Sequence, residues 1–289
     1  MKKFFFSAAL SLFTLMLAAD FTEDFQNAQK QFERRNWNEA AVFFEKAAQN
    51  APVGIKDKCY SYAARALAQQ RKRKEAEETA GKIQNASWKN YTQMEILSTF
   101  GKFNEIAERF QTEKIDTWPE EIAYLGFFLR GRGMGWNPAL SKDAVVDLEK
   151  SLAQCGSDDL TRILVLNTLI RAFRNTGDNA KALAAADKVL AMKKFKGFYA
   201  YLDSAMQKNQ ILISEKKFEE ARKTLDTLNS ERKWNDGAWY LVYLENCGDL
   251  ALAQGKTADA KKFYGQAIAV ENVHPGLTGN VKNKWNKIK

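Results

Sequence analysis

Apolar and polar residues recur along the chain in a pattern that repeats every 30 to 39 residues. Each copy has a polar turn, then a small residue, and then apolar residues four and seven positions later. Apolar residues at this spacing lie on one face of an α-helix. The small residue occupies positions 40, 76, 106, 144, 182, 221 and 260, and it is alanine at all of them except Ile106. The pattern therefore predicts seven helices of one kind.

Each repeat is expected to be a helical hairpin. A first helix leads into a turn rich in Gly, Asn or Lys, and a second helix packs back against the first. The small residue opens the second helix where the two backbones come closest. One hairpin cannot bury its own apolar face, so neighbouring hairpins must stack. Pro52, Pro119 and Pro275 fall where one hairpin ends and the next begins. These positions agree with the predicted hairpins, because proline breaks a helix interior.

These residues resemble the tetratricopeptide repeat (TPR) family. The last copy has Gly248 on its first helix, Gly255 at the turn, and Ala260, Tyr264 and Ala267 on its second helix. The first copy matches with Ala28, Trp37, Ala40, Phe44, Ala47 and Pro52. The resemblance covers residues 21–275 and implies an all-α fold, a right-handed superhelical solenoid of about seven antiparallel helical hairpins. Most copies lack the closing proline, and Lys208-Asn209 replaces the usual apolar–small pair in the sixth.

The fourth copy has a longer turn. Residues Met134 to Ser141 form an expected extended loop before the second helix, and this is similar to a Sel1-type repeat. The run Gly131-Arg132-Gly133-Met134-Gly135 resembles a nucleotide-binding loop only superficially, because such a loop needs a preceding strand and a following helix. These glycines are expected to serve the long turn.

The two ends of the chain differ from the repeats. Lys2 and Lys3 precede an apolar run from Phe4 to Leu17, and the small residues Ala18 and Ala19 that follow suit a cleavage site after Ala19. We interpret residues 1–19 as a secretory signal peptide, with an uncleaved anchor as the alternative. Residues 20–275 are the helical-repeat domain, and residues 276–289 are a basic C-terminal tail or cap. The predicted location is outside the cytoplasm, either periplasmic or extracellular, most typically in a bacterium.

The formal net charge is +9, and it falls to +7 without Lys2 and Lys3. Part of this excess lies in the cluster 71–74 and in the tail, where Lys282, Lys284, Lys287 and Lys289 occur. The clusters are interpreted either as solvated surface or as a site that attracts an anionic surface or an acidic partner. Export argues against a nucleic-acid target. The three cysteines lie about ninety residues apart and are expected to be buried free thiols.

No catalytic or metal-binding constellation is evident in the sequence. The single histidine, His274, precedes Pro275, and one histidine cannot build a histidine-based metal site or a catalytic triad with a positioned nucleophile. The expectation is a protein that is not an enzyme, with no metal and no small-molecule cofactor. An enzyme that hydrolyses a glycan with two facing carboxylates is the alternative from a different class.

The TPR resemblance implies that the first helices of successive hairpins line a concave groove that binds a partner segment. Arg171 and Arg174 are the strongest pair in it, because their spacing puts them on one helix face. The predicted function is an exported scaffold for a protein or peptide partner bearing negative charge. The alternative is a cell-envelope module that makes peripheral contact with anionic membrane lipid or cell-wall polymer. The groove residues are predicted to be Tyr62, Arg65, Gln69, Tyr91, Glu95, Asn167, Arg171, Arg174, Gln207 and Gln210.

Overall fold

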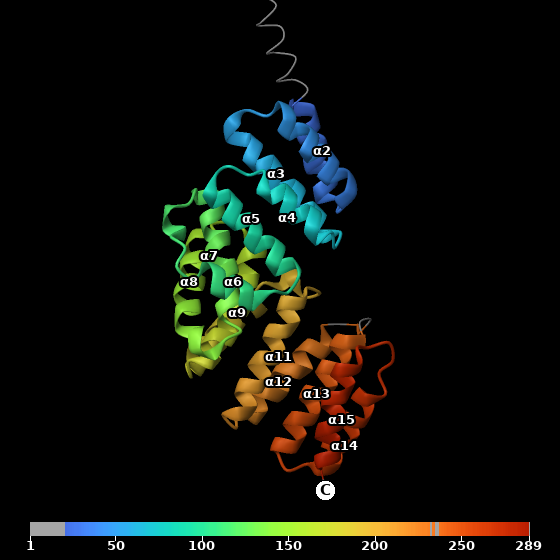
Figure 1. Ribbon diagram of the computed structural model, residues 1–289. Coiled ribbons are helices and arrows are strands. Elements are labelled where there is room, and N and C mark those ends of the chain that lie inside the picture. The colour runs from blue at the N-terminus through green and yellow to red at the C-terminus, as the bar shows by residue number, and fades with distance from the viewer. Residues whose placement is uncertain (1–20, 232, 235–236, 289) are drawn as a thin grey trace, which may run out of the picture. The chain divides into compact units, whose positions relative to one another are not determined.

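The computed structural model describes residues 21–231, 233–234 and 237–288. The predicted signal peptide, residues 1–19, therefore lies outside the described residues. The chain divides into two compact units, one up to Asn137 and one from Pro138 onward. The described residues of both units are helical, with short connections (Figure 1). The expectation of an all-α fold built from antiparallel helical hairpins is confirmed.

Unit 1 starts with a helix over residues 21–33. It continues with α2 (Trp37–Asn50), α3 (Val53–Gln69), α4 (Arg73–Gly81), α5 (Ala86–Thr99), α6 (Phe103–Phe110), the short 3₁₀ helix η1 (Ile115–Thr117) and α7 (Glu120–Met134). Pro52 and Pro119 are the residues that immediately precede α3 and α7, as the sequence predicts.

Unit 2 starts with the 3₁₀ helix η2 (Pro138–Leu140). The helices that follow are α8 (Ser141–Gln154), α9 (Asp159–Asn175), α10 (Asn179–Ala191), η3 (Lys193–Phe195), α11 (Tyr199–Ser214), α12 (Phe218–Ser230), α13 (Gly237–Ala253), α14 (Thr257–Ile268) and α15 (Pro275–Lys287).

Within each unit the helices form two layers. The first helices pack side by side, α3 on α5 and α5 on α7 in unit 1, and α9, α11, α13 and α15 in that order in unit 2. The second helices pack against neighbouring first helices, as α12 does against α11 and α13. This is the contact pattern of stacked hairpins, in which a hairpin buries its apolar face against its neighbours.

The small residue of the repeat has the same place in every second helix. It is always the fourth helical residue, and it is completely buried at Ala40, Ala76, Ile106, Ala144, Ala182, Ala221 and Ala260. Five residues earlier the backbone turns with a positive φ in six of the copies, at Arg35, Arg71, Gly101, Gly177, Lys216 and Gly255. A single residue in this left-handed conformation ends a helix, which is why glycine is common there. The repeat is therefore a backbone repeat as well as a sequence repeat.

The connection after α7 differs from the expectation. Residues 138–140 form the 3₁₀ helix η2 where an extended loop was expected. Gly131 and Gly133 are buried inside α7, so they do not belong to the turn. Gly133 lies where a Cβ atom would be 2.9 Å from the carbonyl oxygen of Phe103, which means that it permits α6 and α7 to approach closely. The expectation was wrong because a glycine-rich run fits both a turn and a close helix contact.

The C-terminal segment forms a helix that covers the last hairpin. The single histidine, His274, precedes α15, and its Nδ1 atom accepts a hydrogen bond of 3.1 Å from the backbone N–H of Gly276. Pro275 is the first residue of the helix, a position where its missing N–H costs nothing. Val281 is completely buried against the core that includes Leu244 and Tyr264. His274 thus has a structural role as a helix cap.

Candidate functional site

The ten residues of the predicted groove form two groups, one in each unit. Tyr62, Arg65 and Gln69 lie on α3, and Tyr91 and Glu95 lie on α5 of unit 1. The remaining five lie on α9 and α11 of unit 2, and they are Asn167, Arg171, Arg174, Gln207 and Gln210. Both groups are on adjacent first helices, and within each group side chains from the two helices contact one another.

In unit 1, Arg65 is surrounded by aromatic rings. Its guanidinium carbon is 5.2 Å from the ring centre of Tyr62 and 5.6 Å from those of Phe32 and Tyr91. A guanidinium at this range is attracted to the negative faces of the rings. Its Nη2 atom is also 3.5 Å from the Oε1 atom of Glu95. Arg65 is therefore held in place by four neighbours and is only partly accessible.

Tyr91 is the buried member of this group. Its side chain is 1% exposed, and its hydroxyl donates a hydrogen bond of 2.8 Å to Glu95. Burial raises the pKa of Tyr91 well above its usual value, so the hydroxyl stays a donor throughout the neutral range. Tyr91 thus positions Glu95, whereas Gln69 on α3 is exposed to solvent.

In unit 2, Asp203 connects the predicted residues of α9 and α11. Its Oδ2 atom accepts hydrogen bonds of 2.9 Å from Asn167 Nδ2 and 2.6 Å from Gln207 Nε2. One turn further along, Arg174 Nη1 donates to Gln210 Oε1 at 3.2 Å. Burial lowers the pKa of Arg174, and the nearby Asp203 acts against this effect. We call this set, Asn167, Arg171, Arg174, Asp203, Gln207 and Gln210, the α9–α11 polar row.

The members of the polar row differ in their accessibility. Gln207 is only 5% exposed and Gln210 is exposed, while Asn167, Arg171 and Arg174 are half-buried. The Oε1 atom of Gln207 is buried without a hydrogen-bond partner among the described residues. Gln207 therefore holds Asp203, and Arg171, Arg174 and Gln210 are the side chains of the row that a partner reaches most easily.

Sequence reasoning did not identify the acidic residues on the first helices of unit 2. These residues are Asp203 on α11 and Glu245 and Asp249 on α13. Lys284 of α15 forms ion pairs with Glu245 at 2.7 Å and with Asp249 at 2.8 Å. Glu245 and Asp249 are four residues apart, a spacing that puts them on one helix face. That spacing was a readable signal, but their partner Lys284 was assigned to a basic C-terminal tail or cap, with no partner named for it.

Some side chains of the basic clusters have partners within the fold. Arg73 forms ion pairs with Glu77 at 2.8 Å and Glu105 at 3.5 Å. The guanidinium of Arg71 donates to the carbonyl oxygen of Thr99 at 3.1 Å. At the other end of the chain, Lys284 is occupied by the two carboxylates of α13. Charges that are already paired contribute little to the attraction of a distant anionic surface.

The three cysteines lie inside the fold. Cys59, Cys155 and Cys247 are buried free thiols, as expected. Burial raises the pKa of Cys59 and of Cys247 to about 11, so both stay protonated and unreactive at neutral pH. Within residues 21–231, 233–234 and 237–288 no cluster of ligating side chains suits a metal ion. Over the same described residues, no helix combines the length and apolar character needed to span a bilayer.

Comparisons with known proteins identify the fold. No protein-family model matches the sequence, and no curated protein matches it. A solved tetratricopeptide repeat protein from Parabacteroides merdae is similar with a TM-score of 0.56 and 12% identity, over 91% of this chain and 98% of that one. PilF of Pseudomonas aeruginosa is similar with a TM-score of 0.52 and 14% identity, over 93% of this chain and 99% of that one. The fold is thus TPR-like, and at these identities the likeness concerns the fold alone. The Sel1-like character of the fourth copy stays a prediction.

Proposed function

We propose that the protein is an exported, non-catalytic scaffold that binds a segment of a partner protein on the first-helix face of its repeats. Folds built from stacked helical hairpins generally present such a face to other proteins. The α9–α11 polar row is the observation that supports this proposal most directly. It places guanidinium, amide and carboxylate groups side by side on two adjacent helices, where they can bind both the backbone and the side chains of a segment.

The row favours a partner with acidic side chains at the end occupied by Arg171 and Arg174. Arginine binds carboxylates with two parallel hydrogen bonds, which fixes the orientation of the partner. Asp203 lies in the other half of the row, where its Oδ2 atom accepts hydrogen bonds from Asn167 and Gln207 of the same chain.

The envelope-binding alternative has less support from the fold. It depends on the basic clusters, and three of their side chains, Arg71, Arg73 and Lys284, are engaged by carboxylates or a carbonyl group of the same chain. Sedimentation with anionic vesicles at low and high salt measures this alternative directly. Strong salt-dependent sedimentation that is lost when Lys282 and Lys287 are changed to Gln would favour it over the scaffold.

Export and partner binding are tested in the native cell. A photoreactive amino acid in place of Gln210, an exposed residue of the row, should crosslink to a partner that mass spectrometry identifies. Fractionation of the same cells should find the protein outside the cytoplasm, with residues 1–19 removed.

The identified partner then allows a quantitative test of the row. Changing both Arg171 and Arg174 to Ala should weaken binding by about tenfold at low salt, because charged contacts of this kind are individually worth 1 kcal/mol or more. The control changes Lys142 and Lys188 to Ala, which removes the same charge from exposed positions outside the row. If the two double variants bind the partner with equal affinity, the row is not the binding site.

A further inference from the structure

A pocket of about 500 Å³ lies in unit 2 between the turn that joins α13 to α14 and the C-terminal end of α15. Its apolar lining comes from Leu252 on α13, Tyr264 on α14 and Ile288, which follows α15. Tyr264 and Ile288 are buried and support the pocket from inside, whereas Leu252 is 42% exposed. The volume is within the range of ligand pockets, about 300–1,000 Å³, and it accommodates a large apolar side chain.

The pocket shares its register with the arginine end of the α9–α11 polar row. Arg174 on α9 precedes the small residue of its hairpin, Ala182, by eight positions. Leu252 on α13 precedes Ala260 by the same number, and Ile213 is the counterpart on α11. Equivalent positions of stacked hairpins lie on the same face of the stack. Because α9, α11 and α13 pack in this order, the pocket continues the first-helix face beyond α11.

The charged groups around the pocket balance one another. The carboxylate of Asp249 accepts hydrogen bonds from the hydroxyl of Tyr264 at 2.7 Å and from Lys284 at 2.8 Å. Lys284 also forms an ion pair of 2.7 Å with Glu245, and Lys287 is the second cation in the lining. Two carboxylates therefore face two ammonium groups, and the apolar part of the lining determines which side chain the pocket favours.

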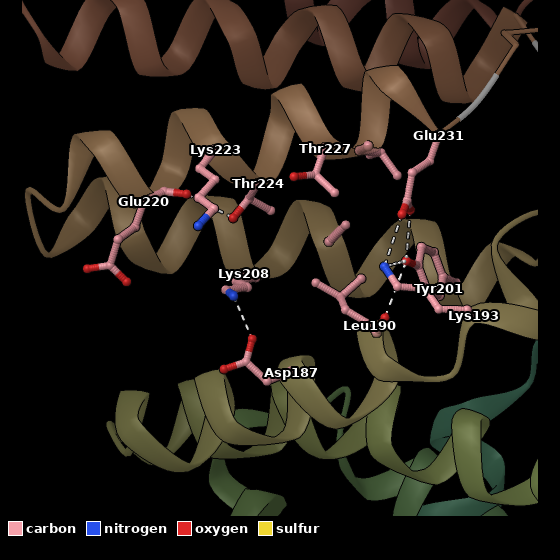
Figure 2. A pocket seen from close by; sticks show the side chains of 12 residues that line it. Asp187, Leu190, Lys193, Tyr201, Lys208, Glu220, Lys223, Thr224, Thr227 and Glu231 are labelled. Atoms are coloured by element: carbon pink, nitrogen blue, oxygen red, sulfur yellow. Dashed lines mark hydrogen bonds and ion pairs between the residues drawn. The ribbon is translucent and has the colours of Figure 1, made fainter.

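The pocket between α10 and α12 (Figure 2) lacks this relation to the polar row. Its walls are two second helices, and three carboxylates and three ammonium groups line it. Lys208 pairs with Asp187 at one end, and Lys193 pairs with Glu231 at the other. Its charges cancel and it lies apart from the row, so the pocket beside α15 is the one that can bind the same segment as the row.

We propose that the pocket beside α15 binds a leucine-sized apolar side chain of the partner segment that binds the polar row, and this rests on the proposed function. The apolar side chain packs on Leu252 and Ile288 and covers the exposed side of Leu252. The aliphatic stem of Lys287 lies along it while the ammonium group stays in water.

The distance between the two binding points defines the partner segment. α11 lies between α9 and α13, so Arg174 and the pocket are two helix spacings apart. Packed helices lie about 8–10 Å apart, which gives a separation of roughly 16–20 Å. An extended segment advances about 3.3 Å per residue, so its acidic residue and its apolar residue should be about five or six positions apart.

Two peptides test the pocket. Acetyl-Glu-Ser-Gly-Ser-Gly-Leu-amide carries both groups at this spacing, and the second peptide has Ala in place of Leu. In the protein labelled with ¹³C at leucine and isoleucine methyl groups, the Leu peptide should shift the signals of Leu252 and Ile288 in a saturable way. It should bind about fivefold or more tightly than the Ala peptide, because its larger side chain buries more apolar surface. Acetyl-Glu-Leu-amide is too short to reach both points and should bind more weakly than the Leu peptide.

Substitution of the exposed leucine identifies the cause of the preference. Leu252→Ser removes the apolar wall and should abolish the difference in affinity between the Leu and Ala peptides. Thermal unfolding of this variant should be nearly unchanged, because Leu252 is exposed, and this separates lost binding from lost folding. Leu160→Ser on α9 is the matched control, since Leu160 is 51% exposed on another first helix, and it should keep the preference.

Three outcomes would overturn the proposal: no shift of the Leu252 and Ile288 methyl signals with the Leu peptide, equal affinity for the Leu and Ala peptides, or an unchanged preference in Leu252→Ser. The variant in which Arg171 and Arg174 are both Ala separates this proposal from the proposed function. It should weaken the binding of both peptides by the same factor and keep the preference for Leu. If it binds both peptides as the native protein does, the row does not bind the acidic residue, and a persisting preference for Leu would still support the pocket.

Discussion

Gly133 on α7 faces Ile106 on α6, and a Cβ atom added to Gly133 would lie 3.1 Å from the Cβ atom of Ile106. Ile106 is the one member of the repeating small-residue position that is not alanine. The bulky residue on one helix is thus accommodated by the absence of a side chain on the next. Two deviations from the repeat, which look unrelated in the sequence, compensate each other in the core of unit 1.

Gly133→Ala should lower the free energy of unfolding by about 2 kcal/mol, because an added methyl group in a tightly packed place forces neighbouring atoms apart. The carbonyl oxygen of Phe103, 2.9 Å from the added atom, cannot move without its helix. The better helix propensity of alanine, about 1 kcal/mol, offsets only part of this cost. Urea denaturation followed by circular dichroism measures the change.

The control for this prediction is Gly81→Ala at the end of α4, where an added Cβ meets no atom within 4 Å. It should leave the stability unchanged or raise it. Combining Gly133→Ala with Ile106→Ala should cost less than the sum of the two single changes, because the smaller residue relieves the crowding. Strict additivity would contradict the proposed compensation.

The repeat itself was predictable from the sequence because it is governed by local rules. A residue that opens the second helix at the point of closest approach must be small, and the turn before it must adopt a left-handed backbone. Both requirements leave a signal within one hairpin, as Gly177 and Ala182 show. The fold and its seven buried positions followed from these signals.

The details of the candidate site depend on contacts between hairpins, which leave weaker signals. Asp203 was missed because its partners Asn167 and Gln207 are recognised only when α9 and α11 are placed side by side. Tyr91 was expected on the groove, but its ring is buried and only its hydroxyl reaches Glu95. Helical periodicity gives the direction of a side chain, but it does not tell how deeply the neighbouring helix covers it.

A buried amide pair connects α11 and α13. Asn209 Nδ2 donates a hydrogen bond of 3.1 Å to Asn246 Oδ1, and Asn246 Nδ2 donates to the carbonyl oxygen of Val242 at 2.9 Å. Both side chains are almost completely buried, and the Oδ1 atom of Asn209 has no partner among the described residues. Asn209→Ala should therefore lower the free energy of unfolding by about 1–3 kcal/mol, because it leaves the acceptor of Asn246 buried and unsatisfied.

The coupling between the two residues distinguishes this cause from a simple loss of volume. Replacing both Asn209 and Asn246 with Ala removes the orphaned acceptor, so the double variant should lose less stability than the two single variants together. Chemical denaturation of the four proteins in this cycle gives the coupling energy. A value near zero would mean that the hydrogen bond does not contribute to the packing of α11 on α13.

Alkaline pH should weaken the attachment of α15 to the last hairpin. Burial by itself lowers the pKa of Lys284, but its ion pairs with Asp249 and Glu245 outweigh burial and raise the pKa above the usual 10.5. Burial, together with a hydrogen bond of 2.7 Å to Asp249, raises the pKa of Tyr264 above the usual 10.0. Because the pKa values of Lys284 and Tyr264 are higher in the folded state than in the unfolded state, the protein takes up protons on folding at pH values near and above 10. The stabilisation is complete below about pH 10 and is lost as the pH rises through the folded-state values.

The measurement compares urea unfolding of the native protein and of Lys284→Gln at pH 8 and at pH 10.5. Other lysines and tyrosines lose protons over this range in both proteins, so their effect cancels in the comparison. The native protein should lose more stability between the two values than Lys284→Gln, because only the native protein has this ion pair to lose. Tyr264→Phe should also show a smaller alkaline loss, since it keeps the ring against Gly248 and lacks the hydroxyl. The same loss in all three proteins would show that the contact between Lys284 and the carboxylates of α13 does not hold α15 in place.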